Sequence, residues 1–406
     1  MSSGTDYIAF LRTALRVPLE CSPRLVWKFI YNFGWRNVKN MAAFERRQAT
    51  GQPFFPAFVM ISVTERCNLA CSGCWVSAGG QRSLSLAQLD GIITESKRRG
   101  SYFFGILGGE PLLYKGLLDL LGKHGDCYFQ LFTNGTLLTG EIARRMRQCG
   151  NITPLLSIEG LEEESDRRRG KTAVFSRTMS GVAACRHERL IFGVAASICR
   201  SNYDELLSRD YINRVARAGA HYLWYYIYRP VGADPHPENA LTKEQIRGFR
   251  RFVVEQRRDA PLFLIETYWD ADGRALCPAA TGMSHHISPS GALEFCPPLQ
   301  MAREFIDESG TNVGELFESS AFLADLRRMV AETSRGCILL ENPAKLVSFL
   351  ESRRATDTTS RRTVLGEYRR MTALPGHDMP GEEIPERNLF YRILKKRYFF
   401  GFGAYG

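Results

Sequence analysis

A repeated strand–loop–helix pattern begins near residue 55 and constrains the fold more than any other feature of this sequence. Six such units in succession predict a parallel sheet with helices outside, closed or partly closed into a barrel. Six units rather than eight predict an α/β fold of the partial (β/α)6 TIM-like barrel type, with one open side. The expected strands span 57–64, 102–107, 128–133, 155–158, 191–198 and 222–228, and the expected helices span 85–99, 115–123, 139–149, 172–186 and 203–218.

Three cysteines, Cys67, Cys71 and Cys74, follow the first expected strand within one short loop. Ligands of α/β sheets and barrels bind at the carboxyl ends of strands, so these thiols lie where a site is expected. Structural zinc usually takes four Cys or His ligands, and no fourth follows nearby. A four-iron cluster held by three thiolates would leave one iron free for chemistry. Both metals remain open from these residues alone.

Small and polar residues also end several later strands. Glycine pairs let a ligand approach the backbone closely, and a carboxylate there can hold an ammonium group. Each feature alone is common in α/β folds, but their joint occurrence at strand ends indicates one site. The residues are Gly108, Gly109 and Glu110, then Thr133, Asn134 and Gly135, then Ser157 and Glu159, and finally Ser197.

The formal net charge of +10 is concentrated at the two ends of the chain. Residues 1–50 carry eight basic residues against three acidic ones, and residues 386–406 carry five against one. The middle is therefore close to neutral, which argues against a nucleic-acid groove over the core. The basic ends indicate contact with something anionic.

Both ends also combine these charges with aromatic residues. Residues 6–50 place an apolar stripe beside a basic flank at helical spacing, which fits either a helix on a membrane surface or a helix packed on the core. The stretch 388–406 has three interpretations: contact with an anionic lipid surface, packing against the open side of the barrel, or an aromatic plug over its mouth.

The motifs over residues 55–235 resemble those of the radical S-adenosylmethionine (SAM) superfamily. In that family the three-cysteine motif binds a [4Fe–4S] cluster whose fourth iron takes the amino and carboxylate groups of SAM. One position departs from the family pattern, since Gly73 stands where many members have an aromatic residue. The resemblance implies cluster ligands Cys67, Cys71 and Cys74, and SAM contacts at Gly108, Gly109, Glu110, Ser157, Glu159, Arg168 and Ser197, with Arg167 and Arg169 as alternatives to Arg168.

A second cysteine set lies further along the chain. Cys277, Gly291 and Cys296 resemble the hairpin that opens the auxiliary-cluster domains called SPASM and twitch. A full SPASM domain has many more cysteines, whereas only Cys337 remains here. The resemblance thus implies one auxiliary iron–sulfur cluster in a small C-terminal domain, with zinc or unliganded thiols as alternatives. Its fourth ligand stays open among His285, His286, Glu341, an exogenous group and the substrate.

The expected organisation has four segments, which differ in composition. No apolar run approaches the roughly 20 residues that span a bilayer, and the amino terminus lacks the apolar core of a signal peptide. We therefore expect a cytoplasmic protein, with peripheral contact at a membrane surface as one of the interpretations of its two ends. The segments are a basic amphipathic helical segment (1–54), the partial barrel (55–235), a linker with the auxiliary-cluster domain (236–350), and a surface linker with a basic aromatic tail (351–406).

The implied function is a radical SAM enzyme that reductively cleaves SAM and abstracts a hydrogen atom from a substrate. The basic, aromatic ends favour a hydrophobic or lipid-linked substrate. The alternatives are a maturase of a ribosomally made peptide and a non-catalytic iron–sulfur electron carrier. The implied partners are SAM, an unidentified substrate and a low-potential electron donor such as flavodoxin or ferredoxin, with no nucleic acid.

Overall fold

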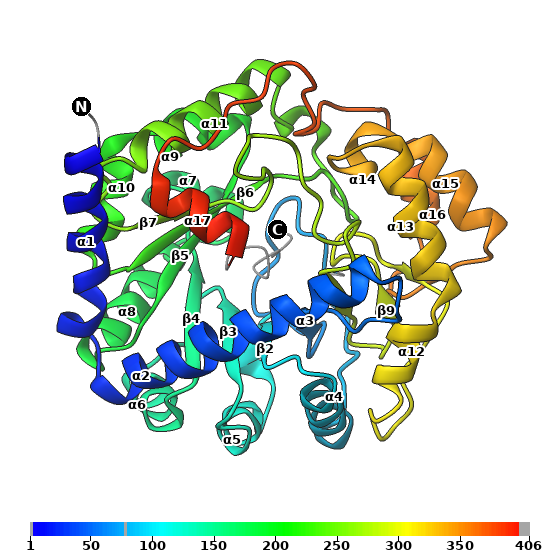
Figure 1. Cartoon of the computed structure of the whole chain (residues 1–406), viewed down its shortest axis with the longest axis horizontal. Coiled ribbons are helices and arrows are strands. Elements are labelled where there is room, and N and C mark those ends of the chain that lie inside the picture. The colour runs from blue at the N-terminus through cyan, green and yellow to red at the C-terminus, as the bar shows by residue number, and fades with distance from the viewer. Residues whose placement is uncertain (1–2, 77–78, 398–406) are drawn as a thin grey trace.

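The computed structural model describes residues 3–76 and 79–397, and a curved nine-stranded sheet forms its centre (Figure 1). The strand order is β7-β6-β5-β4-β3-β2-β1-β8-β9, and all neighbours are parallel except β8 and β9. A separate antiparallel pair joins β10 and β11. The strands are β1 Phe58–Ser62, β2 Phe103–Leu107, β3 Tyr128–Thr133, β4 Ile152–Ser157, β5 Gly193–Ile198, β6 Tyr222–Ile227, β7 Phe263–Ile265, β8 Ser284–Ile287, β9 Leu293–Glu294, β10 Met301–Ala302 and β11 Thr356–Asp357.

Helices surround this sheet on the outside, as the βα pattern predicts. The helices of the barrel and the region after it are α4 Leu86–Arg98, α5 Leu117–Lys123, α6 Gly140–Cys149, α7 Glu162–Arg169, α8 Val174–His187, α9 Tyr203–Leu206, α10 Arg209–Arg217, α11 Lys243–Gln256, α12 Val313–Ser319, α13 Ala321–Thr333, α14 Ile338–Glu341, α15 Pro343–Ser352 and α16 Val364–Arg370. The terminal helices are α1 Ser3–Glu20, α2 Pro23–Lys28, the π-helical η1 Phe29–Arg36, α3 Asn37–Ala49 and α17 Leu389–Arg397.

The predicted α/β partial barrel is confirmed, and its six expected strands form β1 to β6 in chain order. The expected helix 203–218 is divided into α9 and α10, because Ser208 caps a new helix by accepting a hydrogen bond from the Tyr211 amide at 3.1 Å. Strands β7 and β8 lengthen the sheet at its two edges. Since β8 pairs with β1, the sheet continues across the predicted boundary at residue 235.

Alternation along β1 divides its side chains between two apolar layers. Phe58 and Met60 belong to the cluster inside the barrel, whereas Val59 and Ile61 pack in the layer beneath the outer helices. This is the period of two expected for a strand covered on both faces. Apolar side chains therefore fill the barrel interior along β1.

The N-terminal helices close the amino-terminal end of the barrel. Phe29 and Phe33 of η1 pack on the interior cluster, with ring centroids 5.6 Å from Tyr128 and 5.0 Å from Phe103, respectively. Asn32 between them donates to the Cys127 carbonyl at 3.2 Å, just before β3. Of the two interpretations of this segment, packing on the core is therefore observed for η1.

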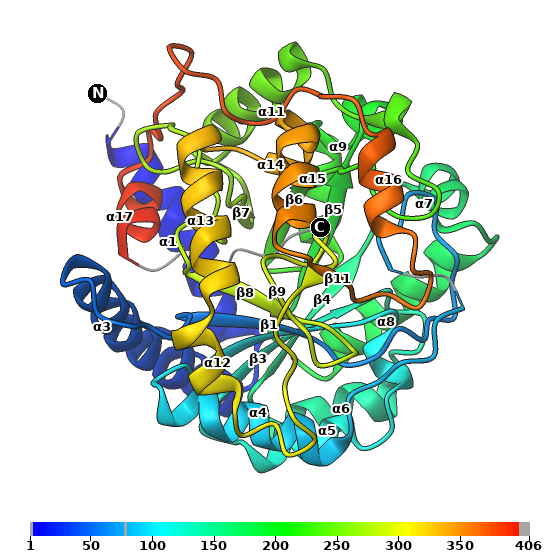
Figure 2. The ribbon, with the colours of Figure 1, turned by 90° about the vertical axis from the view of Figure 1, so that its right-hand side faces the viewer.

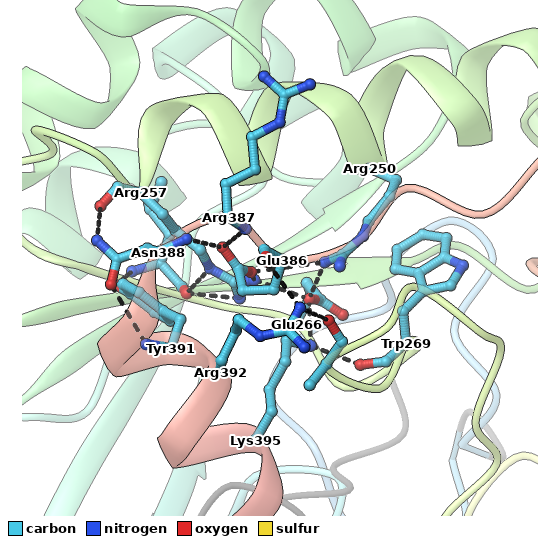
Figure 3. A network of polar contacts seen from close by, with 12 residues as sticks. Arg250, Arg257, Glu266, Trp269, Glu386, Arg387, Asn388, Tyr391, Arg392 and Lys395 are labelled. Atoms are coloured by element: carbon cyan, nitrogen blue, oxygen red, sulfur yellow. Dashed lines mark hydrogen bonds and ion pairs between the residues drawn. The ribbon is translucent and has the colours of Figure 1, made fainter. Parts of the chain in front are cut away.

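The C-terminal helix α17 covers the edge strand β7 and lies beside α1 (Figure 1). Tyr391 accepts a hydrogen bond from the Leu264 amide of that edge at 3.0 Å. Lys395 is 3% exposed and donates to Glu266 at 2.6 Å within the buried charge network of Figure 3. Covering an edge strand in this way prevents its unpaired amides from templating aggregation. This part of the tail packs against the barrel, while residues 398–406 lie outside the described residues.

The stretch 351–385, expected to run over the surface as a linker, is partly a packed element. It contains β11 and α16, and α16 lies beside α15 (Figure 2). Tyr368 and His377 are buried within it. Its polar composition led to the linker prediction, because the few buried residues that pack it against the protein are short interruptions in a charged sequence. Across the described residues, no helix combines the length and the apolarity that a membrane crossing requires.

Candidate active site

A cavity of about 410 Å³ opens at the carboxyl ends of the barrel strands. It gathers residues from the loops after β1, β2, β4 and β5, which are far apart in sequence, as a barrel site should. The predicted residues that line it are Cys67, Cys71, Cys74, Gly108, Gly109, Thr133, Asn134, Ser157, Glu159, Arg168 and Ser197.

The three thiols of the first loop are accessible from this cavity. Cys67 and Cys74 are exposed and Cys71 is half-buried. The loop is closed by a hydrogen bond from the Cys74 amide to the Cys71 carbonyl at 3.3 Å, and the Ser72 amide donates to the Arg168 carbonyl at 2.9 Å. The loop is thus fixed both within itself and to the end of α7.

The structure explains why glycine stands at position 73, where many family members have an aromatic residue. Its φ of +69° lies in the left-handed region, and a Cβ there would stand 2.0 Å from the Tyr228 hydroxyl. Tyr228 follows β6, lines the cavity and donates to the Pro235 carbonyl at 2.6 Å. An aromatic ring from another strand therefore occupies the space that a side chain at residue 73 would need.

Gly109 allows the loop after β2 to pass directly beneath the cysteine loop. A Cβ at this position would lie 2.4 Å from the Arg66 carbonyl oxygen and 2.5 Å from that of Glu65. Its own amide donates to the Thr64 carbonyl at 2.7 Å. The glycine pair is thus required by the close approach of two backbones at the cavity floor.

Glu110 is fully buried and does not line the cavity. Its carboxylate accepts hydrogen bonds from the Thr133 hydroxyl at 2.7 Å, the Asn134 amide at 2.8 Å and the Leu112 amide at 3.0 Å. Burial raises its pKa. In this structure Glu110 joins the ends of β2 and β3, so a role as an ammonium partner of SAM stays a prediction.

Glu159 is the centre of a charged cluster on the other side of the cavity. It accepts from Arg168 at 3.0 Å, from Arg169 at 2.6 Å and from the Ser197 amide at 2.9 Å. The Arg169 guanidinium also lies 3.7 Å from Cys71 Sγ. Two buried guanidiniums and a carboxylate thus connect the predicted ribose side of the site to the thiols.

Arg168 was selected from three consecutive arginines, and the structure separates them. Arg168 and Arg169 both line the cavity, whereas Arg167 is exposed and pairs with Glu164 at 2.5 Å. Sequence reasoning named Arg169 only as an alternative to Arg168, and it missed Tyr228 after β6. The position of Tyr228 at a strand's carboxyl end was the available signal, because that is where barrel sites take their residues.

The second cysteine set also comes together in space. Cys277, Cys296 and Cys337 line one enclosed pocket beside the barrel. Arg229, which follows β6, lines both this pocket and the larger cavity, and its Nε donates to Cys337 Sγ at 3.3 Å. One arginine therefore lies between the two thiol groups.

Most of the predicted candidates for a fourth ligand lie elsewhere. His286 uses both ring nitrogens, with Glu294 at 2.6 Å and Ser62 at 2.8 Å. Glu341 is held by the Ser334 hydroxyl and the Cys337 amide, and His285 by the Phe295 carbonyl at 3.0 Å and Arg327 at 3.2 Å. None of the three is among the residues that line the pocket.

Each thiol group supplies three sulfur donors, which is the ligand type that an iron–sulfur cluster takes. Within residues 3–76 and 79–397, no three His, Cys, Asp or Glu side chains are grouped as a site for a single metal ion. Four thiolates on one tetrahedral zinc stand less than about 4 Å apart, given the short Zn–S bond. A four-iron cluster separates its thiolates further, because each binds a different iron.

Comparison with known proteins gives one family match and several partial relatives. Residues 61–198 match the family model of the radical SAM superfamily. The Fe-coproporphyrin III synthase of Methanosarcina barkeri is 28% identical over 211 residues, which cover 49% of this chain and 51% of that protein. The sporulation killing factor maturation protein SkfB of Bacillus subtilis is 28% identical over 171 residues, 41% of each chain. The chain thus spans about half the length of these curated relatives.

Solved structures share the fold. SuiB of Streptococcus suis bound to S-adenosylmethionine has 15% identity and a TM-score of 0.58, covering 70% of this chain and 71% of that one. The anSMEcpe protein with bound AdoMet has 14% identity and a TM-score of 0.54, covering 85% of this chain and 92% of that one. These structures support a partial TIM-like barrel.

Proposed function

We propose that this chain, whose residues 61–198 match the radical SAM family model, is a radical SAM enzyme with a second iron–sulfur cluster. The observation that carries the proposal is the convergence of Cys67, Cys71 and Cys74 with the Glu159 cluster in one cavity. When bound, a [4Fe–4S] cluster supplies one electron that cleaves SAM to methionine and a 5′-deoxyadenosyl radical, which then takes a hydrogen atom from the substrate.

The chain's own residues would hold and orient these groups. The three thiolates would hold three irons of a four-iron cluster, and the remaining iron would be open to SAM. Glu159 accepts hydrogen bonds, so it fits the ribose hydroxyls, and Ser157 adds a hydroxyl beside it. Arg168 fits a carboxylate, because its guanidinium can donate two parallel hydrogen bonds. The packed barrel interior below excludes water from the radical.

Spectroscopy of the reduced protein tests this assignment directly. SAM added to the reconstituted protein should change the electron paramagnetic resonance (EPR) signal of the first cluster, because SAM binds its free iron. The Cys67→Ala/Cys71→Ala/Cys74→Ala variant should lose that signal. If the EPR signal of the wild-type protein does not change when SAM is added, the proposal is contradicted and the non-catalytic electron carrier is favoured. Reduced flavodoxin or ferredoxin should reduce the first cluster in place of the chemical reductant.

Peripheral membrane contact is supported by the exposed apolar residues. Of eleven large hydrophobic side chains exposed among the described residues, nine lie on the terminal helices. Basic residues accompany them, and Lys39 stacks on Trp35 at 4.8 Å. Such surfaces suit anionic lipid, and a lipid-linked substrate could enter from there. The nine are Leu11, Leu15, Leu19, Trp27, Ile30, Tyr31, Trp35, Leu389 and Ile393.

Vesicle sedimentation tests the contact. The Trp27→Ser/Trp35→Ser variant should lose binding to vesicles that contain phosphatidylserine, while Leu86→Ser, an exposed leucine on α4, should bind as the wild type does. Equal binding by both variants would contradict a membrane surface. The protein would act in the cytoplasm at that surface.

A second candidate is the modification of a ribosomally made peptide. The similarity to SkfB, a maturation protein, favours it. A short open reading frame beside this gene would supply the peptide for a binding test. Tight binding of that peptide, together with deuterium transfer from it to 5′-deoxyadenosine, would favour this substrate class over a lipid.

A further inference from the structure

We propose that His377 is the fourth protein ligand of the auxiliary cluster held by Cys277, Cys296 and Cys337. This inference deepens the proposed function and rests on its second cluster. A four-iron cluster has four ligand positions, and three thiolates occupy three of them. His377 lines the pocket together with these cysteines. Its side chain is an imidazole, which is a common metal ligand.

The hydrogen bonds of His377 leave one ring nitrogen available. Nε2 lies 3.3 Å from the Leu276 carbonyl oxygen, and a carbonyl only accepts, so Nε2 carries the proton. Nδ1 then has a free lone pair, and no hydrogen bond to Nδ1 occurs among the described residues. A metal-bound histidine typically donates its other N–H to a backbone carbonyl in this way. Leu276 directly precedes Cys277, so this contact ties the ring to the segment that carries one of the pocket thiols.

The ring is held rigidly at the pocket. His377 is 4% exposed, and its ring centroid lies 5.0 Å from that of Tyr268 and 5.9 Å from that of Trp269. The Trp269 indole N–H also donates to the His377 carbonyl at 3.0 Å. A ligand fixed by backbone and ring contacts pays little entropy on binding a metal.

The loop that carries His377 is built against the loop that carries Cys337. The Arg335 amide donates to the Asp378 carboxylate at 3.0 Å. Gly376 permits the approach, since a Cβ there would stand 1.8 Å from a Glu341 carboxylate oxygen. The chain therefore returns to the same pocket forty residues after Cys337. This separation explains why sequence spacing alone did not reveal His377.

Pulsed EPR of the full-length Cys67→Ala/Cys71→Ala/Cys74→Ala protein, which isolates the second cluster, tests the proposal. We expect this parent to bind iron and sulfide and to show strong ¹⁴N coupling from a directly bound nitrogen. Adding His377→Cys should keep the iron, abolish that coupling and shift the midpoint potential downward, because an anionic thiolate replaces a neutral imidazole. Adding His285→Gln, a buried histidine outside the pocket, should leave the coupling unchanged.

Three outcomes would overturn the ligand assignment. These are a parent cluster without ¹⁴N coupling, a coupling that survives His377→Cys, and a coupling that His285→Gln abolishes. A parent that binds no iron would overturn the second cluster and its histidine together. SAM cleavage by the wild-type protein would then still show whether the first cluster and the proposed reaction stand.

Discussion

The Arg169 guanidinium lies 2.6 Å from the Glu159 carboxylate and 3.7 Å from Cys71 Sγ. One side chain therefore contacts both the cysteine loop and the carboxylate expected at the ribose of SAM. Its N–H groups can stabilise a thiolate as well as orient Glu159. The two halves of the cavity are thus coupled, and a change on one side should be measurable on the other.

Glu159→Gln tests this coupling. The variant leaves Arg168 and Arg169 buried without their counter-charge, so we expect the free energy of unfolding to fall by about 3 kcal/mol. SAM affinity should fall at least tenfold, or by about 1.4 kcal/mol, for one lost charged hydrogen bond. Denaturant unfolding and equilibrium dialysis measure these. Glu163→Gln, which changes an exposed carboxylate on α7, should change neither; equal losses in both variants would refute the coupling.

Gly73→Ala should disturb the cysteine loop by displacing Tyr228. The Cβ would clash with the Tyr228 hydroxyl, in addition to the strain of a positive φ. Gly79→Ala is a matched control, because Gly79 has a φ of +75° and no atom within 4 Å of a Cβ. We expect Gly79→Ala to cost about 1 kcal/mol through strain alone and to retain iron. Gly73→Ala should lose iron from the first site, and Gly73→Ala/Tyr228→Leu should regain part of it. Equal iron contents in the two single variants would contradict the account.

The buried charge network of Figure 3 predicts opposite effects of two substitutions. Arg250, Arg257 and Lys395 face Glu266 and Glu386, so the network holds three cations and two anions. Glu266→Gln leaves three cations against one anion, and we expect a loss of about 3–5 kcal/mol and release of α17 to proteases. Lys395→Met balances the charges and should cost far less. If Lys395→Met lowered the free energy of unfolding more than Glu266→Gln does, the charge balance of the network would not be what holds α17.

The same network predicts how stability depends on pH. Burial opposes ionisation of Glu266, but Lys395, Arg250 and Arg257 together lower its pKa from 4.5 to about 2. The unfolded chain then binds more protons between these values, so the contribution is complete above pH 4.5 and is lost as the pH falls toward 2. It amounts to about 3 kcal/mol. Unfolding free energies from pH 6 to 3 should fall more steeply for the wild type than for Glu266→Gln; parallel slopes would contradict this.

Phe33→Ala should open the amino-terminal end of the barrel. Removing this half-buried ring, which packs 5.0 Å from Phe103, leaves a space on the interior cluster, and we expect a cost of about 1–3 kcal/mol. Trp35→Ala, two residues away and 57% exposed, should change the free energy of unfolding by less than about 0.5 kcal/mol. If both variants unfold alike, η1 does not close the barrel.

The sequence predicted the repeating barrel and the thiols because both depend on local patterns. Strands β1 to β6 were visible as short apolar runs bounded by glycine and polar residues, and the cysteine spacing is contained in one loop. Strand β8, with the sequence Ser-His-His-Ile, has no such pattern; the resemblance to the auxiliary-cluster hairpin predicted a strand there, but not its pairing with β1. Its position depends on a contact more than 200 residues away.

The site was predicted by residue type more reliably than by contact. Glu110 and Glu159 both follow strands as carboxylates, yet one is enclosed by Thr133 and Asn134 while the other faces the cavity. Whether such a carboxylate is enclosed or faces the cavity depends on residues of the neighbouring strand, which the local sequence does not show. His377 is a similar case, since its partner cysteines come from three other segments and its own stretch is polar.

The central claim is reductive cleavage of SAM at Cys67, Cys71 and Cys74, and the most direct measurement is chromatographic quantification of 5′-deoxyadenosine. Anaerobically reconstituted, reduced protein should form it from SAM, and Cys149→Ala, which changes an isolated cysteine, should form as much. Cys71→Ala should form none. No product from iron-loaded wild-type protein, or equal product from Cys71→Ala, would contradict the account.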